Sequence, residues 1–221
     1  MLPEQLERGD LAWVERRRDI RIIVSLPGRY SLADRRDARG ERRQFACRAV
    51  SISNHAMALA APVNGKLGER VIADIDELGK LQGIVGHLLE RGFVMAIAAS
   101  DEDRATLADK IEWLEKHKNL EVPDGRTHKR FMPENPYSTL ALHDGTIMTC
   151  FVIDISVSGA AVSADTVPAI GTVLAVGKAI GRVVRHFAGG FAVKFVDLHN
   201  LDSIEALVMG HSSDKCVKRA P

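Results

Sequence analysis

The stretch LGKLQGIVGHLLERGFVMAI, residues 78–97, recurs in altered form as VGKAIGRVVRHFAGGFAVKF, residues 176–195. Both stretches carry a Gly-Lys pair near the start and a Gly-Phe pair near the end, and the matching positions keep a constant offset of 98 residues. An internal repeat determines the architecture of a chain, so it is interpreted before any short motif. This one indicates that a single structural unit is used twice.

Two further matches lie upstream of this repeat. FACRAVSIS at residues 45–53 corresponds to MTCFVIDIS at residues 148–156, with an offset of 103 residues. A pair of arginines four residues apart recurs at an offset of 109 residues, as Arg17 and Arg21 in the first copy and Arg126 and Arg130 in the second. The offset changes between blocks while their order is kept, so the copies differ in loop length and share a fold.

The repeat divides the chain into two predicted domains, residues 1–118 and 119–221. Segment 119–127 contains Pro123 and Gly125 and reads as the linker between them. The C-terminal ten residues are polar and are expected to fray.

Within each copy, short runs rich in apolar and β-branched residues alternate with turn residues. The predicted strands are 71–75, 83–89 and 93–98 in the first copy, and 146–153, 159–163, 172–176, 182–187 and 191–195 in the second. Short strands at this spacing predict a small antiparallel barrel. Each copy then closes with a predicted helix, the first introduced by a capping box at Ser100–Asp103 and the second carrying one apolar face. The expected fold is mainly β: two small barrels in tandem, each followed by an α-helix.

The composition excludes several classes of protein. The chain has 221 residues, of which 46% are hydrophobic and 27% charged, an ordinary globular composition. No apolar run approaches the ~18 residues of a membrane span, and the charged N-terminus has no signal-peptide segment. Three scattered cysteines without a CxxC pair argue against a disulfide framework and a zinc site. We therefore expect a cytoplasmic protein with no membrane association and no metal, in which Cys47 and Cys150 are small core residues.

Charge is balanced overall but unevenly distributed. The chain has 30 basic and 29 acidic residues, yet 12 of its 20 arginines lie in the first 48 residues. A solvated, salt-bridged surface is one interpretation, because Asp34, Asp37 and Glu41 are interleaved with these arginines. Anion binding is the other, because the arginine fork suits phosphate groups and stacks on bases.

The second copy combines two short motifs. Arg126-Thr-His-Lys-Arg130 is an RxxxR segment just before a predicted strand, and Asp154-Ile-Ser-Val-Ser-Gly159 is a DxSxxG segment near the end of another. RxxxR followed by DxSxxG at this separation, inside a duplicated β pattern, resembles the PilZ family, whose domains bind cyclic di-GMP. The resemblance covers nearly the whole chain, once per copy, and includes the Gly-rich ending of each. It implies a ligand between the RxxxR segment and the DxSxxG loop.

The residue types suit that ligand. Arg126 and Arg130 can each bind a phosphate or the O6/N7 edge of guanine, or stack on the base. Asp154 can accept hydrogen bonds from guanine N1–H and N2–H₂, Ser156 offers a hydroxyl, and Gly159 permits a tight turn or a close backbone approach. The alternatives are that the arginines are only solvated, that Asp154 forms an Asx turn, and that Gly159 is a simple turn residue.

The first copy departs from this pattern. It has the fuller arginine segment, with Arg16, Arg17 and Arg21, and it retains Ser53. Ser51, however, stands where the second copy has Asp154, and Ala56 stands where it has Gly159. We expect the second domain to be the receptor, with the first domain binding weakly or serving as a partner or dimerisation surface.

The function expected from the resemblance is a cyclic di-GMP receptor that changes the arrangement of its two domains on binding. By the same resemblance, the regulated process is bacterial motility, surface polysaccharide or the cell cycle. The alternatives are a ligand-independent protein-interaction adaptor and, less favoured, a nucleic-acid-binding protein with few aromatic residues for stacking. No catalytic signature is present and no cofactor is expected. His128 and His143 lie in the region of the predicted site, but the sequence gives neither a catalytic partner.

Overall fold

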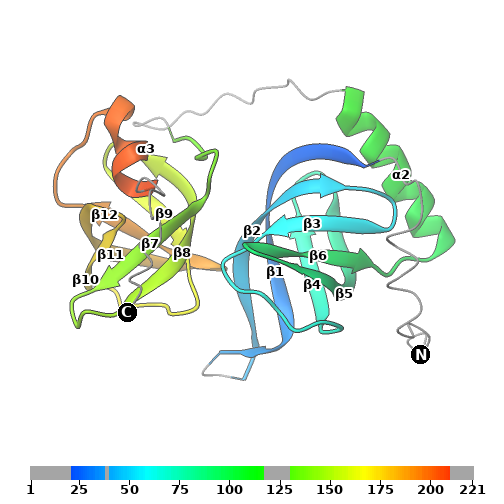
Figure 1. Ribbon diagram of the computed structural model, residues 1–221, viewed down its shortest axis with the longest axis horizontal. Coiled ribbons are helices and arrows are strands. Elements are labelled where there is room, and N and C mark those ends of the chain that lie inside the picture. The colour runs from blue at the N-terminus through cyan, green and yellow to red at the C-terminus, as the bar shows by residue number, and fades with distance from the viewer. Residues whose placement is uncertain (1–20, 38–39, 117–129, 210–221) are drawn as a thin grey trace, which may run out of the picture. The chain divides into compact units, whose positions relative to one another are not determined.

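The computed structural model describes residues 21–37, 40–116 and 130–209 and shows two closed six-stranded barrels in tandem (Figure 1). The first barrel consists of β1 (Ile22–Arg36), β2 (Arg42–Ile52), β3 (Ala56–Ala60), β4 (Arg70–Ile75), β5 (Gly79–Leu89) and β6 (Gly92–Ile97), followed by helix α2 (Asp101–Lys116). The second consists of β7 (Tyr137–Leu142), β8 (Ile147–Ser156), β9 (Gly159–Ser163), β10 (Val173–Val176), β11 (Ala179–Phe187) and β12 (Gly190–Phe195), followed by α3 (Leu201–Met209). The predicted fold is confirmed.

The two barrels share one topology. Around the first barrel the strand order is β1-β2-β3-β6-β5-β4, and around the second it is β7-β8-β9-β12-β11-β10, all pairings being antiparallel. Equivalent hydrogen bonds recur at the offsets found in the sequence. Ile97 N donates to His55 O at 2.8 Å in the first barrel, and Phe195 N donates to Ser158 O at 2.9 Å in the second. The repeat in the sequence is therefore a repeat of structure.

The chain forms two compact units. The first comprises Met1–Gly125 with Ser163–Thr166 and Phe187–Gly190, and the second comprises the remaining residues. The predicted boundary after residue 118, the linker 119–127 and the C-terminal ten residues lie outside the described residues.

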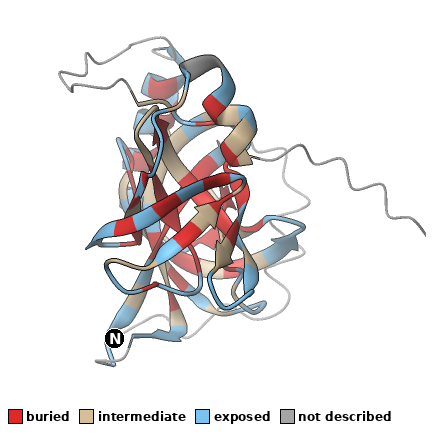
Figure 2. Cartoon of the chain, turned by 90° about the vertical axis from the view of Figure 1, so that its left-hand side faces the viewer, coloured by how far each residue is buried: buried red, intermediate tan, exposed pale blue. Residues whose placement is uncertain are grey.

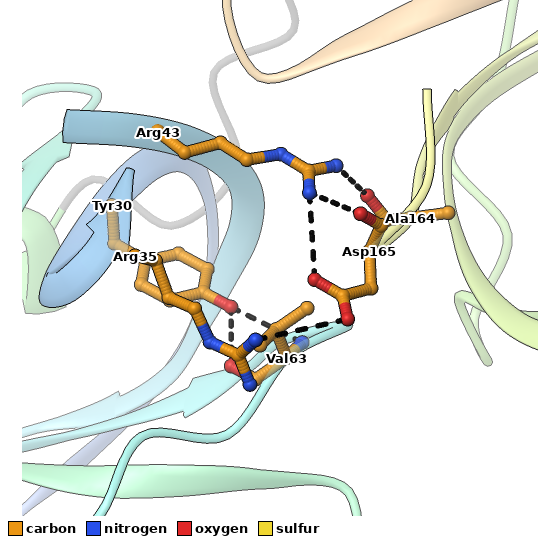
Figure 3. Close-up of polar contacts among 6 residues, drawn as sticks. All are labelled: Tyr30, Arg35, Arg43, Val63, Ala164 and Asp165. Carbon is orange, nitrogen blue, oxygen red and sulfur yellow. Dashed lines mark hydrogen bonds and ion pairs between the residues drawn. The ribbon is translucent and has the colours of Figure 1, made fainter. Parts of the chain in front are cut away.

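Alternation of side chains along each strand places apolar residues inside the barrels. The buried positions form the interior in Figure 2, with exposed positions between them along the strands. Tyr30 lies 5.6 Å from Phe45 and 5.4 Å from Phe93, between ring centroids, in the first barrel. The Tyr30 hydroxyl donates to Val63 O at 2.5 Å and accepts from Val63 N at 3.2 Å (Figure 3). These bonds satisfy the one polar atom of a fully buried ring.

The cysteines expected in the core lie there. Cys47 and Cys150 are both buried and free. Burial raises the pKa of both thiols, that of Cys150 to about 12, because a thiolate is poorly solvated in the barrel interior. Both behave as small apolar residues.

Helix α2 begins as the sequence predicts. Ser100 Oγ accepts a hydrogen bond from Asp103 N at 3.1 Å and donates to the Asp103 carboxylate at 2.7 Å. Its apolar face, Leu107, Ile111 and Leu114, is buried in the core of the first barrel. In α3, Ile204 and Val208 are fully buried.

Candidate site at the Arg130–Asp154 pair

The candidate site lies where the chain enters the second barrel. Phe131 forms an isolated antiparallel bridge with Ile155 on β8, with N···O distances of 3.0 and 2.9 Å. This bridge brings Arg130, the residue before Phe131, beside Asp154, the residue before Ile155. The RxxxR and DxSxxG segments, 24 residues apart at these positions, therefore meet through backbone pairing.

Arg130 and Asp154 form an ion pair at this point. Arg130 Nη1 lies 3.2 Å from each of the two carboxylate oxygens of Asp154. The side chains are 33% and 24% exposed, so the pair is partly shielded and still reachable from solvent. A donor and an acceptor group thus lie together at the end of β8.

Ser156 and Gly159 flank a tight turn between β8 and β9. Ser156 is buried, and its hydroxyl donates to Gly159 O at 3.3 Å and lies 3.4 Å from Ser158 Oγ. The turn is also held from outside, because Val157 O accepts from His199 N at 3.0 Å and Ser158 O accepts from Phe195 N at 2.9 Å. The Ser156 hydroxyl therefore stabilises the turn beside the ion pair.

Gly159 is required for a close approach between strands. A Cβ at this position would lie 2.4 Å from Val193 O on β12, closer than any side chain allows. Its φ lies outside the left-handed region, so a turn that needs a positive φ is not the reason for glycine here. The close contact is with the barrel itself.

The remaining predicted residues of this site are placed as follows. Arg126 and His128 lie outside the described residues. His143 lies in the turn that precedes β8, and Asp154 lies near the other end of that strand, so the seven steps from Ile147 to Asp154 alone span about 23 Å of extended chain. The expectation that His143 lies near the site is wrong, because an extended strand places its two ends far apart.

The first barrel shows the same geometry without the carboxylate. Ile22 pairs with Ile52 as Phe131 pairs with Ile155, so Arg21 and Ser51 occupy the positions of Arg130 and Asp154. Arg21 is exposed, and it forms no ion pair with any other described residue. Arg16 and Arg17 lie outside the described residues.

Ser53 has the same role as Ser156. Its hydroxyl donates to Ala56 O at 3.3 Å and accepts from Ala56 N at 3.2 Å. The turn is held from outside here too, by Arg104 Nη1 donating to Asn54 O at 2.7 Å. The serine shared by the two copies thus belongs to the turn, and the difference between the copies is the acid at 154.

Sequence reasoning assigned Arg130 and Asp154 separately to a ligand and missed that they contact each other. The matching offsets align Arg130 with Arg21 and Asp154 with Ser51, but the contact between the two positions follows from the pairing of Phe131 with Ile155. Among the described residues, no group of three or more His, Cys, Asp or Glu side chains is placed to hold a metal ion. Nor does this part of the chain contain a helix with the length and apolar character of a membrane span.

Comparisons with known proteins identify the second barrel. Residues 124–210 match the family model of the PilZ domain. A comparison with curated proteins gave no match.

Several solved structures resemble the chain at low identity. They include Borreliella burgdorferi PlzA in complex with c-di-GMP, at 11% identity and a TM-score of 0.26, over 90% of this chain and 96% of that one. The Bacillus subtilis inhibitor of motility MotI/DgrA has 12% identity and a TM-score of 0.26, over 85% and 94%. Escherichia coli YcgR in complex with c-di-GMP has 10% identity and a TM-score of 0.26, over 83% and 80%. These TM-scores are too low to support a conclusion about this chain. The family match therefore lies on the second of the two barrels, whose strand order the first barrel repeats.

Proposed function

We propose that the second barrel is a receptor for cyclic di-GMP, with Arg126, Arg130, Asp154 and the Ser156–Gly159 turn forming the site. The observation that carries the proposal is the ion pair of Arg130 and Asp154 beside a fixed turn, in the barrel that matches the PilZ family. The ligand presents two phosphodiester groups and two guanine bases. A guanidinium and a carboxylate side by side complement both kinds of group.

The ion pair leaves capacity for a ligand. The described contacts of Arg130 to Asp154 use Nη1 alone, so the other N–H groups of this guanidinium are donors for a phosphate or for guanine O6 and N7. Each carboxylate oxygen of Asp154 has lone pairs beyond those facing Arg130, and these are acceptors for guanine N1–H and N2–H₂. The role of Ser156 in this proposal is indirect, through the turn.

The output we propose is a change in the freedom of the two units. Residues 121–130 connect the two copies in sequence and include both arginines of the RxxxR segment. Ligand bound at these arginines restricts the connection, and a ligand shifts a conformational equilibrium to the extent that it binds one state better. The proposed consequence is regulation of motility, surface polysaccharide or the cell cycle, through a protein partner or a homodimer. The chain acts as a receptor, without catalysis or a cofactor.

Titration calorimetry on the full chain tests the proposal. Wild type is expected to bind cyclic di-GMP at micromolar concentration, and Arg130→Ala is expected to bind about 10- to 100-fold more weakly, because it removes hydrogen bonds to a charged group. Arg21→Ala is the matched control, since it removes the equivalent arginine of the first barrel, and it should leave the affinity unchanged. Cyclic di-AMP, a dianion without the guanine edge, should bind at least tenfold more weakly.

Three results would overturn the proposal in different ways. Absence of heat for wild type would favour the ligand-independent adaptor. Loss with Arg21→Ala and not with Arg130→Ala would place the site in the first barrel. Equal binding of the two cyclic dinucleotides would show that the site recognises phosphate without reading the base.

A further inference from the structure

The β1–β2 strand pair is longer than its counterpart in the second barrel. β1 and β2 have 15 and 11 residues, whereas β7 and β8, at the same place in the strand order, have 6 and 10. The sequence offset falls from 109 at the arginines to 103 at the cysteines, so the first copy has six extra residues here. An insertion of this kind is not needed to close the barrel.

The two strand pairs also differ in charge. Residues 22–52 carry seven arginines, no lysine and three acids, whereas residues 137–156 carry no arginine or lysine and two acids. Because the second pair closes the same barrel without arginine or lysine, barrel closure itself does not require these side chains. Several of them have contacts within the first unit, such as Arg29 with Asp74, so an explanation outside folding is needed only for those without an acidic partner among the described residues.

The extra residues form a two-stranded ribbon. β1 pairs with β4 only as far as Leu32, which lies opposite Val71, and beyond that point its remaining partner is β2. Figure 1 shows this ribbon in blue, running past the other strands of the first barrel to its hairpin. We name its described residues, 33–37 and 40–44, the β1–β2 arm.

The arm holds two arginines directly opposite each other. Arg36 on β1 pairs with Arg42 on β2, and both are exposed. Side chains at such positions start about 5 Å apart, and like charges placed there destabilise the ribbon. An anion between the two guanidinium groups removes that repulsion.

Four of the other five charged side chains of the arm have contacts, and the fifth residue, Glu41, is held through its backbone. Asp37 accepts from Glu41 N at 2.9 Å, closing the hairpin, and Asp34 lies 3.7 Å from Lys66 Nζ. Within the first unit, Arg43 donates to the carbonyls of Ala164 and Asp165, and Arg35 lies 3.9 Å from the Asp165 carboxylate (Figure 3). Arg36 Nη1 donates to Gly40 O at 2.7 Å, and this bond orients the guanidinium group. Because a carbonyl is neutral, the bond does not neutralise the charge of Arg36.

We propose that the β1–β2 arm binds nucleic acid, with Arg36 and Arg42 contacting backbone phosphates of a duplex. A two-stranded ribbon fits the major groove of DNA, and arginine forms the bidentate contact that phosphate favours. The chain as a whole has balanced charge, but contact with about two phosphates does not require a basic molecule. The surface is independent of the cyclic di-GMP site proposed above.

Fluorescence anisotropy with a labelled duplex of mixed sequence tests the proposal on the full chain. Binding is expected in the weak, sequence-independent range, with a Kd of about 1–100 µM, and log K should fall with log salt at a slope of about −2, one unit per phosphate. Arg36→Gln with Arg42→Gln should weaken binding at low salt about tenfold or more and bring the slope near zero. Arg70→Gln with Lys80→Gln removes the same charge from β4 and β5 and should change affinity less than about twofold.

Several outcomes would overturn this assignment. One is the absence of binding to the duplex at about 100 µM protein in low salt. Another is an equal loss of affinity in both double variants, which would show a general charge effect. Poly-L-glutamate or phosphatidylglycerol vesicles binding more tightly than the duplex, with the same loss on changing Arg36 and Arg42, would show that the arm serves an acidic protein or a lipid surface. Circular dichroism of the variants verifies that both remain folded, and unchanged heat with cyclic di-GMP verifies that the receptor site is separate.

Discussion

At the scale of single residues, the two copies differ most at the position filled by Asp154 in one and Ser51 in the other. Both positions precede an isoleucine that pairs with the residue after an arginine, so the backbone places Arg21 beside Ser51 as it places Arg130 beside Asp154. If the Asp154 carboxylate is what positions the arginine for the ligand, the first barrel lacks a binding site because it lacks that one carboxylate.

Ser51→Asp is therefore expected to create a second site. The measurement is the stoichiometry of cyclic di-GMP binding by calorimetry, which should rise from one ligand site per chain to two. Ser51→Asn, of nearly the same shape without the charge, is the control and should leave the stoichiometry at one. A stoichiometry of one with Ser51→Asp would show that the carboxylate alone does not make the site.

Gly159 gives a prediction about stability. Its Cβ position lies 2.4 Å from Val193 O, so Gly159→Ala must push β9 from β12 or twist the turn. We expect this variant to lose about 1–3 kcal/mol of unfolding free energy, the cost of overpacking. Urea denaturation measures the loss. The reverse change in the first barrel, Ala56→Gly, should cost about 1 kcal/mol or less, because it only loosens a buried strand residue; equal losses in the two variants would contradict the close-contact explanation.

At the scale of elements, α2 depends on its first turn. Ser100 caps Asp103 N, and the helix then packs Leu107, Ile111 and Leu114 on the barrel. Ser100→Ala should lower the unfolding free energy of the first barrel by about 1 kcal/mol, the usual cost of a lost N-cap. Thr106→Ala, at an exposed position inside the same helix, should change it by less than about 0.5 kcal/mol. Thermal unfolding of both variants compares them, and an equal effect of the two would mean that the cap contributes nothing.

How well each element could be predicted follows from the kind of signal that its residues give. The α2 cap, both closing helices and the strands from β4 to β6 and from β8 to β12 are local patterns, and the sequence identified them. It set no bounds for β1, because the ribbon that leaves the barrel has no buried face to produce alternation beyond Leu32. It set no bounds for β3, since Ala56–Ala60 is buried at every position and has no period of two.

The site shows the same limit. Motif spacing was enough to select Arg130 and Asp154, whose roles toward a ligand stay predictions. Their contact with each other depends on the register of Phe131 against Ile155, which is a pairing between segments distant in sequence. The role of Gly159 likewise depends on β12, which approaches from 34 residues later. Sequence patterns report local geometry, and these contacts are made by topology.

At the scale of the whole molecule, the duplication gives each barrel its own core. Phe93 and Phe191 sit at equivalent positions 98 residues apart, and both are fully buried. Each barrel also closes its own sheet, so its hydrogen bonding does not need strands from the other. Two separate cores predict two cooperative unfolding transitions in one chain.

Calorimetric unfolding of the full chain can assign those transitions. Phe93→Ala should lower the unfolding free energy of the first barrel by about 3–5 kcal/mol and leave that of the second barrel unchanged. Phe191→Ala should do the converse. Cyclic di-GMP at 100 times its Kd should raise the unfolding free energy of the second barrel alone, by about 2.7 kcal/mol, because only the barrel that binds the ligand is stabilised by it. The transition that shifts should therefore be the one that Phe191→Ala lowers. If both variants lower one shared transition, the two barrels unfold as one cooperative unit, and coupling between them must then be part of how the receptor transmits its signal.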